Sequence, residues 1–308
     1  MSAIEDIVRA AVADKRLRRV GRAALGIGAV TAGVAGAVGA SLATLMYQAR
    51  DATGAIENAA HAAALAQGLV DESAVFDWQD LPPNGDGVYF PDGSGPRRRG
   101  PSGTLVLTVL GDSTSVGYGC TMASQVPGVL LAKAAAASLR RPVRVRSHGV
   151  VGSDTADLVA QLAPALADGP DAVAIMVGAN DVRDRVPPHR AAEQLERAVG
   201  MLRSHGIAVV VGTCPDLGVI QPMHQPLRRV AGAWSRRLAR LQGRAVQRAG
   251  GVAVALDRLV SPDFYGRPDL FYADGFHPSA LGYAKATAAL TPAVVDALRD
   301  GGGYPATA

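Results

Sequence analysis

The sequence contains few of the residues on which disulfide-bonded and metal-binding proteins depend. Only two cysteines occur among its 308 residues, Cys120 and Cys214, which excludes a disulfide framework and a zinc site made of paired cysteines. The two could pair if the domain is exported, and nothing in their separate loops requires it. No histidine has HExxH spacing or a neighbouring cluster of carboxylates. We therefore expect neither a metal ion nor another cofactor.

Charged and aromatic residues are also scarce. Charged residues make up 19% of the chain and apolar residues 48%, so a sizeable core can form and a wholly disordered chain is excluded. The net charge is only +4, and much of the positive excess lies in two short clusters, residues 15–22 and 97–99. A nucleic-acid-binding protein more often carries basic residues along a folded face with aromatic residues between them. We therefore expect no nucleic-acid partner.

One long apolar run lies near the N-terminus. No charged residue occurs between Arg22 and Arg50, and the run is long enough to cross a bilayer as a helix. Six basic residues precede it and Arg50 stands nearly alone behind it, so the positive-inside rule predicts a cytoplasmic N-terminus over residues 1–22. The interpretation is a transmembrane helix over residues 23–47, with the rest of the chain extracytoplasmic at the cell membrane. A cleaved leader, which would make the protein secreted, and a buried helix of a soluble protein are the alternatives.

Residues 48–103 are predicted to connect this segment to a folded domain. An Ala-rich, helical stalk comes first, and a Pro/Gly-rich loop follows over residues 81–103. This loop is either a linker or a segment that wraps onto the domain through Val88, Tyr89 and Phe90.

Short apolar runs alternate with longer helical patterns in the predicted domain, residues 104–300, before a short flexible tail, 301–308. Strands are expected at 104–110, 142–147, 171–177, 207–212 and 251–256, and helices near 124–139, 155–166, 189–204, 225–249 and 279–299. Continuous apolar strands that alternate with helices indicate a parallel sheet with helices on both faces. Ligands of such sheets bind at the carboxyl ends of the strands.

Three polar motifs occur at these positions. Ser113 follows the first strand in a GDS motif, and Asn180 follows the third strand in a GAND motif. The third motif, DGFHP, directly precedes the last helix, and its Asp274 can hold one imidazole nitrogen of His277. The other nitrogen is then free to take a proton from a serine hydroxyl. Taken singly, each motif could equally be an ordinary turn.

Two further loops carry candidate residues. Gly152 follows the second strand, where a glycine lets a backbone N–H approach a developing oxyanion, and Asp154 or Thr155 is expected to cap the next helix. The side-chain amide of Asn180 suits the same oxyanion. Asp181 is expected to fix its loop by accepting hydrogen bonds from backbone N–H groups.

In this order, the GDS, GxND and DxxH motifs resemble those of the SGNH (GDSL-like) hydrolase family. The resemblance implies that Ser113 is the nucleophile, that His277 acts as general base and then acid, and that Asp274 orients it. An oxyanion hole from Asn180 and the backbone N–H groups of Ser113 and Gly152 is implied as well. The implied fold is a three-layer α/β/α sandwich around a central parallel, flavodoxin-like sheet of five strands.

The resemblance covers residues from about 104 to 290, and it has one departure. Many family members carry Asn a few residues before the second-block glycine, where this chain has Ser147 and His148. The GxSxG elbow is absent, which disfavours the general α/β-hydrolase fold. Asp257, which follows the last strand, is the alternative partner for His277. Three other residues are expected to line the cleft: Tyr118, Pro215 and Leu217.

The expected function is that of a serine esterase or acyl hydrolase that cleaves carboxylic esters of lipids or envelope glycans through an acyl-enzyme. Two alternatives remain open: an acyltransferase that uses the same triad, and a catalytically inactive ligand-binding module. The sequence determines neither the acyl chain length nor the oligomeric state.

Overall fold

The structure is a computed structural model that describes residues 27–68 and 82–301; the side chains of residues 27–40 are not described. The chain divides into two compact units, residues 1–51 and 52–308. The predicted cytoplasmic segment and almost all of the predicted tail lie outside the described residues.

Helix α2 (Ile27–Ala66) contains most of the predicted transmembrane segment. Within residues 27–68 and 82–301, no helix is both long enough and apolar enough to span a membrane. The prediction of a transmembrane helix over residues 23–47 is therefore not supported by the structure. The run consists largely of Gly and Ala rather than Leu, and residues 23–26 lie outside the described part.

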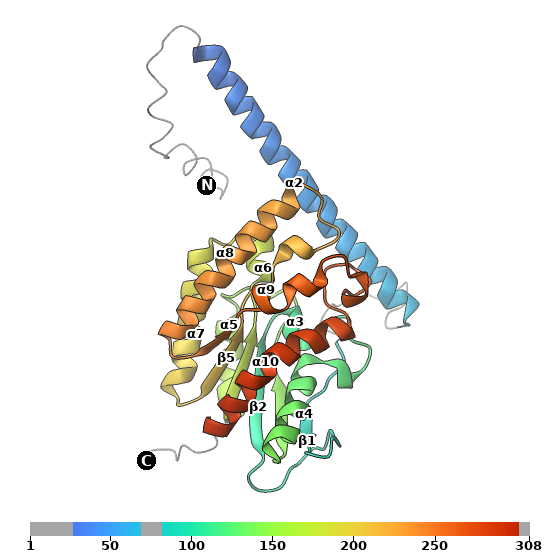
Figure 1. Cartoon of the computed structure of the whole chain (residues 1–308), viewed down its shortest axis with the longest axis vertical. Coiled ribbons are helices and arrows are strands. Elements are labelled where there is room, and N and C mark those ends of the chain that lie inside the picture. The colour runs from blue at the N-terminus through green and yellow to red at the C-terminus, as the bar shows by residue number, and fades with distance from the viewer. Residues whose placement is uncertain (1–26, 69–81, 302–308) are drawn as a thin grey trace. The chain divides into compact units, whose positions relative to one another are not determined.

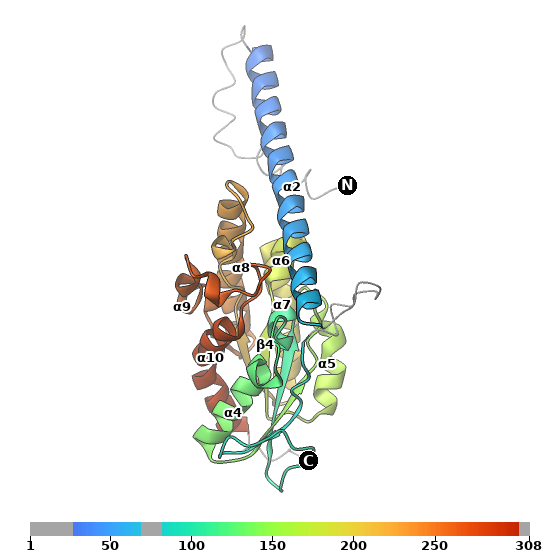
Figure 2. The ribbon, with the colours of Figure 1, turned by 90° about the vertical axis from the view of Figure 1, so that its right-hand side faces the viewer.

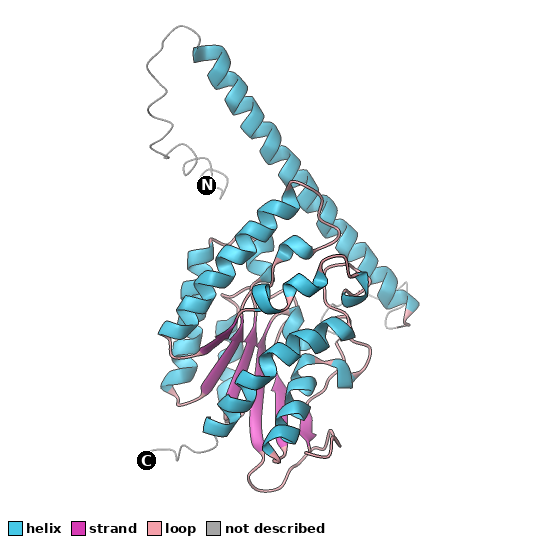
Figure 3. Ribbon diagram, in the orientation of Figure 1, coloured by secondary structure: helices cyan, strands magenta, loops and turns pink. Residues whose placement is uncertain are grey.

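A six-stranded sheet forms the centre of the second unit (Figure 3). Its strands are β1 (Gly87–Tyr89), β2 (Leu105–Gly111), β3 (Val143–Ser147), β4 (Ala172–Met176), β5 (Ala208–Gly212) and β6 (Val252–Val254). They lie in the order β1-β3-β2-β4-β5-β6, and every pair from β3 to β6 is parallel. Counted without β1, this is the 2-1-3-4-5 order of flavodoxin-like folds. The predicted five parallel strands are confirmed, and a sixth strand is added.

Helices cover both faces of the sheet (Figure 1). On one face lie α4 (Pro127–Leu139) and α10 (Ala280–Gly301), and on the other lie α5 (Leu158–Ala167), α7 (Pro188–Ser204) and α8 (Leu227–Arg248). Figure 2 shows α4 and α10 on one side of β4 and α5 on the other. Alternate side chains of β4 enter the two apolar clusters: Ala174 and Met176 pack toward α4 and α10, and Val173 and Ile175 toward α5 and α7. This double burial explains the continuous apolar strand and confirms the three-layer arrangement.

Short helical segments fill the loops. They are α3 (Ser113–Val116), α6 (Ala179–Arg183) and α9 (Leu256–Leu259), together with 3₁₀ turns at Ala123–Gln125, Leu217–Val219, Ser261–Phe264 and Pro268–Leu270. The first two of these helices begin directly after β2 and β4, at the carboxyl edge of the sheet.

Strand β1 shows that part of the Pro/Gly-rich loop belongs to the sheet. It pairs antiparallel with β3, Val88 and Tyr89 are fully buried, and the Tyr89 hydroxyl donates to the carbonyl of Gly85 (2.8 Å). The Pro/Gly-rich loop was expected to be either a linker or a segment that wraps onto the domain. The structure shows that it wraps onto the domain. Three residues flanked by Pro and Gly are too few to give a periodic strand pattern, which is why the sequence did not reveal β1.

The last turns of α2 also contact the second unit, to which they belong. Ala60 and Ala64 are buried in a small cluster with Tyr118. A free stalk would leave both alanines exposed, so this part of the predicted stalk is a component of the folded unit.

Candidate active site

The three motifs come together at the carboxyl edge of the sheet. The Nε2 atom of His277 lies 2.9 Å from the hydroxyl oxygen of Ser113, and its Nδ1 atom lies 2.6 Å from Oδ2 of Asp274. The other carboxylate oxygen of Asp274 accepts hydrogen bonds from the backbone N–H groups of Phe276 and His277, at 2.8 and 2.9 Å. Because the Asp274 side chain is fully buried and bound on both oxygens, it fixes the direction of the imidazole. The alternative partner, Asp257, lies in α9 and does not occupy this position.

The turn that presents Ser113 is tightly constrained. Gly111 has φ +132°, and a Cβ atom there would lie 1.8 Å from the carbonyl oxygen of Met176. Only glycine fits this approach of β2 to β4. The chain then enters α3 with Asp112 as its N-cap, whose side chain accepts from the backbone N–H of Thr114 (2.8 Å). Ser113 is thereby the first residue of α3.

Three N–H groups in the loops at this edge of the sheet have a hydrogen available for a ligand. Asn180 is buried in α6, and its side-chain amide uses one hydrogen to bind the carbonyl of Ser153 (2.8 Å). An amide nitrogen carries two hydrogens, so one is left for a ligand. Within the described residues, the backbone N–H groups of Ser113 and Gly152 donate to no other residue. Gly152 has φ +86°, the left-handed backbone that favours glycine.

Asp181 fixes its loop, as expected from the sequence. Its carboxylate accepts from the hydroxyl of Thr155 (2.8 Å) and from the backbone N–H of the same residue (3.2 Å to Oδ2). The N-cap of α5 is Asp157, so the prediction that Asp154 or Thr155 caps this helix is wrong. Asp154 instead stabilises the turn before α5 by accepting from the N–H of Ala156 (2.7 Å), and Thr155 joins the second loop to the third.

Two buried carboxylates near the serine have raised pKa values. Burial raises the pKa of Asp112 to about 6, against hydrogen bonds from Thr114 and the charge of His277. Burial also raises the pKa of Asp181 to about 7, against the Thr155 hydrogen bonds, and the neighbouring acids Asp154 and Asp112 raise it further. The hydroxyl of Ser113 bonds to His277, whereas the two carboxylates bond to Thr114 and Thr155 and so fix the shape of the loops.

Aromatic rings surround the imidazole of His277. The ring of Tyr118 packs against it with centroids 4.3 Å apart, and the ring of Phe276 lies edge-on at 4.8 Å. Tyr118 is fully buried, so it supports the histidine and does not line an open cleft as the sequence suggested. Leu217 is buried in a cluster with Phe276 at its edge, and Pro215 is partly buried after β5.

The departure from the family pattern lies outside this constellation. His148 pairs with Asp168 (Nε2 to Oδ2 2.7 Å), and the backbone N–H of Ser147 donates to Asp86 (3.0 Å). Both residues thus secure the loop that leads to Gly152. The sequence left open whether Cys120 and Cys214 form a disulfide. In the structure both are buried and neither is in a disulfide.

Two glutamines that the sequence did not single out hold the loops of the site. Gln161 of α5 accepts from the backbone N–H of Gly111 (2.8 Å) and donates to the carbonyl of the same residue (2.9 Å). Gln242 of α8 accepts from the N–H of Cys214 (2.7 Å) and donates to the carbonyl of Val177 (3.2 Å). Each is a polar residue on the otherwise apolar, buried face of a helix. That irregularity is visible in the sequence and indicates a buried hydrogen bond.

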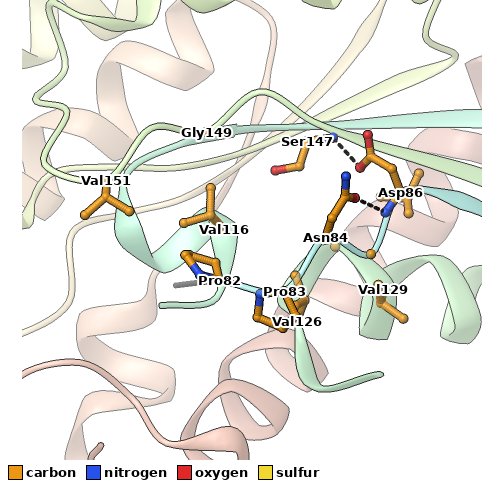
Figure 4. Close-up of a pocket in the computed structure, with 13 residues that line it drawn as sticks. Pro82, Pro83, Asn84, Asp86, Val116, Val126, Val129, Ser147, Gly149 and Val151 are labelled. Carbon is orange, nitrogen blue, oxygen red and sulfur yellow. Dashed lines mark hydrogen bonds between the residues drawn. The ribbon is translucent and has the colours of Figure 1, made fainter. Parts of the chain in front are cut away.

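A pocket of about 150 Å³ lies beside α3 (Figure 4). It is lined by Val116 of α3, by Val129 of α4, by Val151 and by Pro82 and Asn84. The catalytic candidates are not among its lining residues, so it is not the reaction cleft. Within residues 27–68 and 82–301, no group of three or more His, Cys, Asp or Glu side chains is placed to hold a metal ion.

A sequence model of the GDSL-like lipase/acylhydrolase family matches residues 109–285, more than half of the chain. The chain belongs to this family. It is 44% identical over 228 residues to the GDSL-like esterase Rv1075c of Mycobacterium tuberculosis (strain ATCC 25618 / H37Rv), and the match covers 72% of each chain.

Solved structures share the fold. TesA matches with a TM-score of 0.52 and 23% identity, over 63% of this chain and all of TesA. The lipase/acylhydrolase from Enterococcus faecalis matches with a TM-score of 0.52 and 25% identity, over 67% of this chain and all of that protein. Membership of the GDSL-like family makes the chain a serine hydrolase of carboxylic esters, with a small-molecule ester as substrate.

Proposed function

We propose that Ser113, His277 and Asp274 are the catalytic triad of this esterase and that the reaction proceeds through an acyl-enzyme. The observation that carries the proposal is the continuous chain of hydrogen-bonding atoms from Asp274 through His277 to Ser113, at 2.6 and 2.9 Å. These separations are within the reach that proton transfer between a serine and its base requires.

Asp274 sets the proton positions for this chemistry. Its Oδ2 accepts the Nδ1–H of His277, which leaves Nε2 without a hydrogen and able to take the proton of the Ser113 hydroxyl. The serine oxygen then attacks the ester carbonyl. The protonated imidazole gives its proton to the leaving alcohol, and water, activated in the same way, releases the acid from the serine.

The negative charge of the tetrahedral intermediate needs donors. We assign this role to the side-chain amide of Asn180 and to the backbone N–H groups of Ser113 and Gly152. The Asn180 amide is held in place by its bond to Ser153, so no reorganisation is needed when charge develops. Fixed donors of this kind typically contribute about a hundredfold or more to the rate.

The proposed substrates are acyl esters of lipids or envelope glycans. A transfer of the acyl group to another alcohol would use the same residues and differ only in the acceptor. The ratio of hydrolysis to transfer products in the presence of an added alcohol separates the two reactions.

The test is hydrolysis of p-nitrophenyl esters from acetate to palmitate by the detergent-solubilised full chain, with Ser113→Ala and the exposed-residue control Ser204→Ala. We expect activity and covalent labelling by a fluorophosphonate in the wild type and the control, and neither in Ser113→Ala. Activity that survives Ser113→Ala would refute the assignment of the nucleophile. A folded wild-type chain that neither hydrolyses nor labels would favour a ligand-binding module.

We also propose that the N-terminal segment holds the enzyme at the cell membrane, with the esterase domain extracytoplasmic. The support is the charge-free run between Arg22 and Arg50 and the basic residues before it. Carbonate extraction of membranes tests the attachment: the full chain should stay in the pellet. Release into the supernatant would contradict an integral anchor and favour a cleaved leader.

A further inference from the structure

The side chains that pack against His277 extend from the active site to the N-terminal helix. The Tyr118 ring packs against the imidazole, with centroids 4.3 Å apart, and it shares an apolar cluster with the buried alanines Ala60 and Ala64 of α2. Val151, which directly precedes Gly152, also packs against this cluster.

A polar contact attaches the same helix end to the histidine loop. The side-chain amide of Gln67 donates to the hydroxyl of Tyr272 (3.2 Å), and the backbone N–H of Tyr272 donates to the carbonyl of His277 (2.8 Å). The Tyr272 ring lies edge-on to Tyr118, with centroids 6.1 Å apart, and crosses Gly119 so closely that a Cβ atom there would approach it to 2.7 Å. Tyr272 therefore joins the end of the helix to Tyr118 and to the histidine loop.

We propose that Tyr118 is a positioning residue for His277 and that the end of α2 together with the turn that follows it, residues 60–67, holds Tyr118 in place. The inference rests on the proposed function, because it assigns a role that acts through the catalytic imidazole. The helix end thereby completes the esterase site, although no residue of it lies in the motifs of the family.

The burial of Tyr118 determines how its loss is measured. Since none of its surface is exposed, it does not contact a substrate in the cleft, and it acts only through its neighbours. A substitution that loosens the imidazole lowers the rate of the chemical step and leaves substrate binding nearly unchanged. Misplacement of a reacting group by about 1 Å can cost about a hundredfold in rate.

The experiment measures kcat and KM on p-nitrophenyl butyrate for full-length Tyr118→Phe, Tyr118→Leu and a matched control, Tyr89→Leu, which removes an equally buried tyrosine from β1. We expect Tyr118→Leu to lower kcat at least tenfold with KM changed less than twofold. Tyr118→Phe, which keeps the ring, should stay within threefold of the wild type, and Tyr89→Leu should lower the melting temperature but not kcat.

A second pair of variants tests the helix. Ala64 is fully buried, and Ala62 on the same helix is exposed. Ala64→Leu overfills the contact with Tyr118 and should lower kcat at least fivefold, whereas Ala62→Leu should change nothing.

The proposal is overturned if Tyr118→Leu keeps kcat within twofold of the wild type, or if Tyr89→Leu lowers kcat as much as Tyr118→Leu does. It is also overturned if Ala64→Leu and Ala62→Leu behave alike. Failure of the proposed function gives a different result, since it would show as activity that survives Ser113→Ala.

Discussion

Replacement of Asp274 by Asn is the sharpest test of the proposed proton positions. The carboxylate uses Oδ1 for two backbone N–H groups and Oδ2 for the Nδ1–H of His277. An asparagine has one oxygen and must choose between these partners. If the oxygen faced the imidazole, two backbone donors would meet an NH₂ group, and each unsatisfied buried donor costs about 1–3 kcal/mol. The oxygen therefore stays with the backbone, and the NH₂ group faces the imidazole.

The consequence is a histidine with its proton on the wrong nitrogen. An NH₂ donor beside Nδ1 requires Nδ1 to be an acceptor, so the hydrogen moves to Nε2 and points at the hydroxyl of Ser113. That imidazole no longer accepts the serine proton. Exchange of the aspartate for asparagine in a serine-protease triad lowers kcat about 10⁴-fold, which corresponds to about 5.4 kcal/mol of activation free energy. We expect an effect of the same order here, with KM changed little, because Asp274 is buried away from the substrate.

The assay is hydrolysis of p-nitrophenyl butyrate, combined with a thermal melt to show that the variant is folded. Asp257→Asn is the matched control, since Asp257, which follows β6, is the alternative partner that the sequence offers for His277, and it should retain full activity. If folded Asp274→Asn kept kcat within tenfold of the wild type, the proposed role of Asp274 would be refuted. A large loss in Asp257→Asn would reassign that role to Asp257.

Three further predictions concern the loops around the serine. Asn180→Ala should lower kcat about 10²- to 10³-fold in a folded protein, measured with the same ester, and an unchanged kcat would remove Asn180 from the oxyanion hole. Gly111→Ala should destabilise the fold by about 3 kcal/mol or more in a urea titration, because its Cβ atom would overlap the Met176 carbonyl at 1.8 Å in a left-handed backbone; wild-type stability would contradict the tight approach of β2 to β4. Asp181 has a folded-state pKa of about 7, above its ordinary 3.8, so the stability it contributes is present below about pH 4 and lost as the pH rises through 7. The melting temperature of the wild type minus that of Asp181→Asn should therefore fall between pH 4 and pH 8, and a difference independent of pH would show that the carboxyl does not titrate in this range.

The strands and the catalytic candidates were predictable because their signals are local. The central strands β4 and β5 are buried on both faces, so each reads as an uninterrupted apolar run, as Ala172–Met176 of β4 illustrates. Asp274 and His277 are three residues apart, and the turn that brings their side chains together is contained in the motif itself. Strand β1 gave no such signal, because its pairing with β3 depends on a sheet edge formed by residues more than fifty positions later.

The residues that position the site were not predictable, since their partners are distant in the sequence. Gln161 holds Gly111 across 50 positions, and Gln67 reaches Tyr272 across 205. Their sequence signals differ. Gln161 interrupts the apolar face of an amphipathic helix, and a buried polar side chain needs a hydrogen-bond partner. The sequence therefore predicts that Gln161 makes a buried hydrogen bond, but it does not predict with which residue. Ala60 and Ala64 give no signal of this kind, because alanine suits an exposed helix and a close helix contact equally well. Whether this part of the helix is exposed or buried depends on the ring of Tyr118, which packs against Ala60 and Ala64 and lies beside His277. The sequence of the helix does not contain that information.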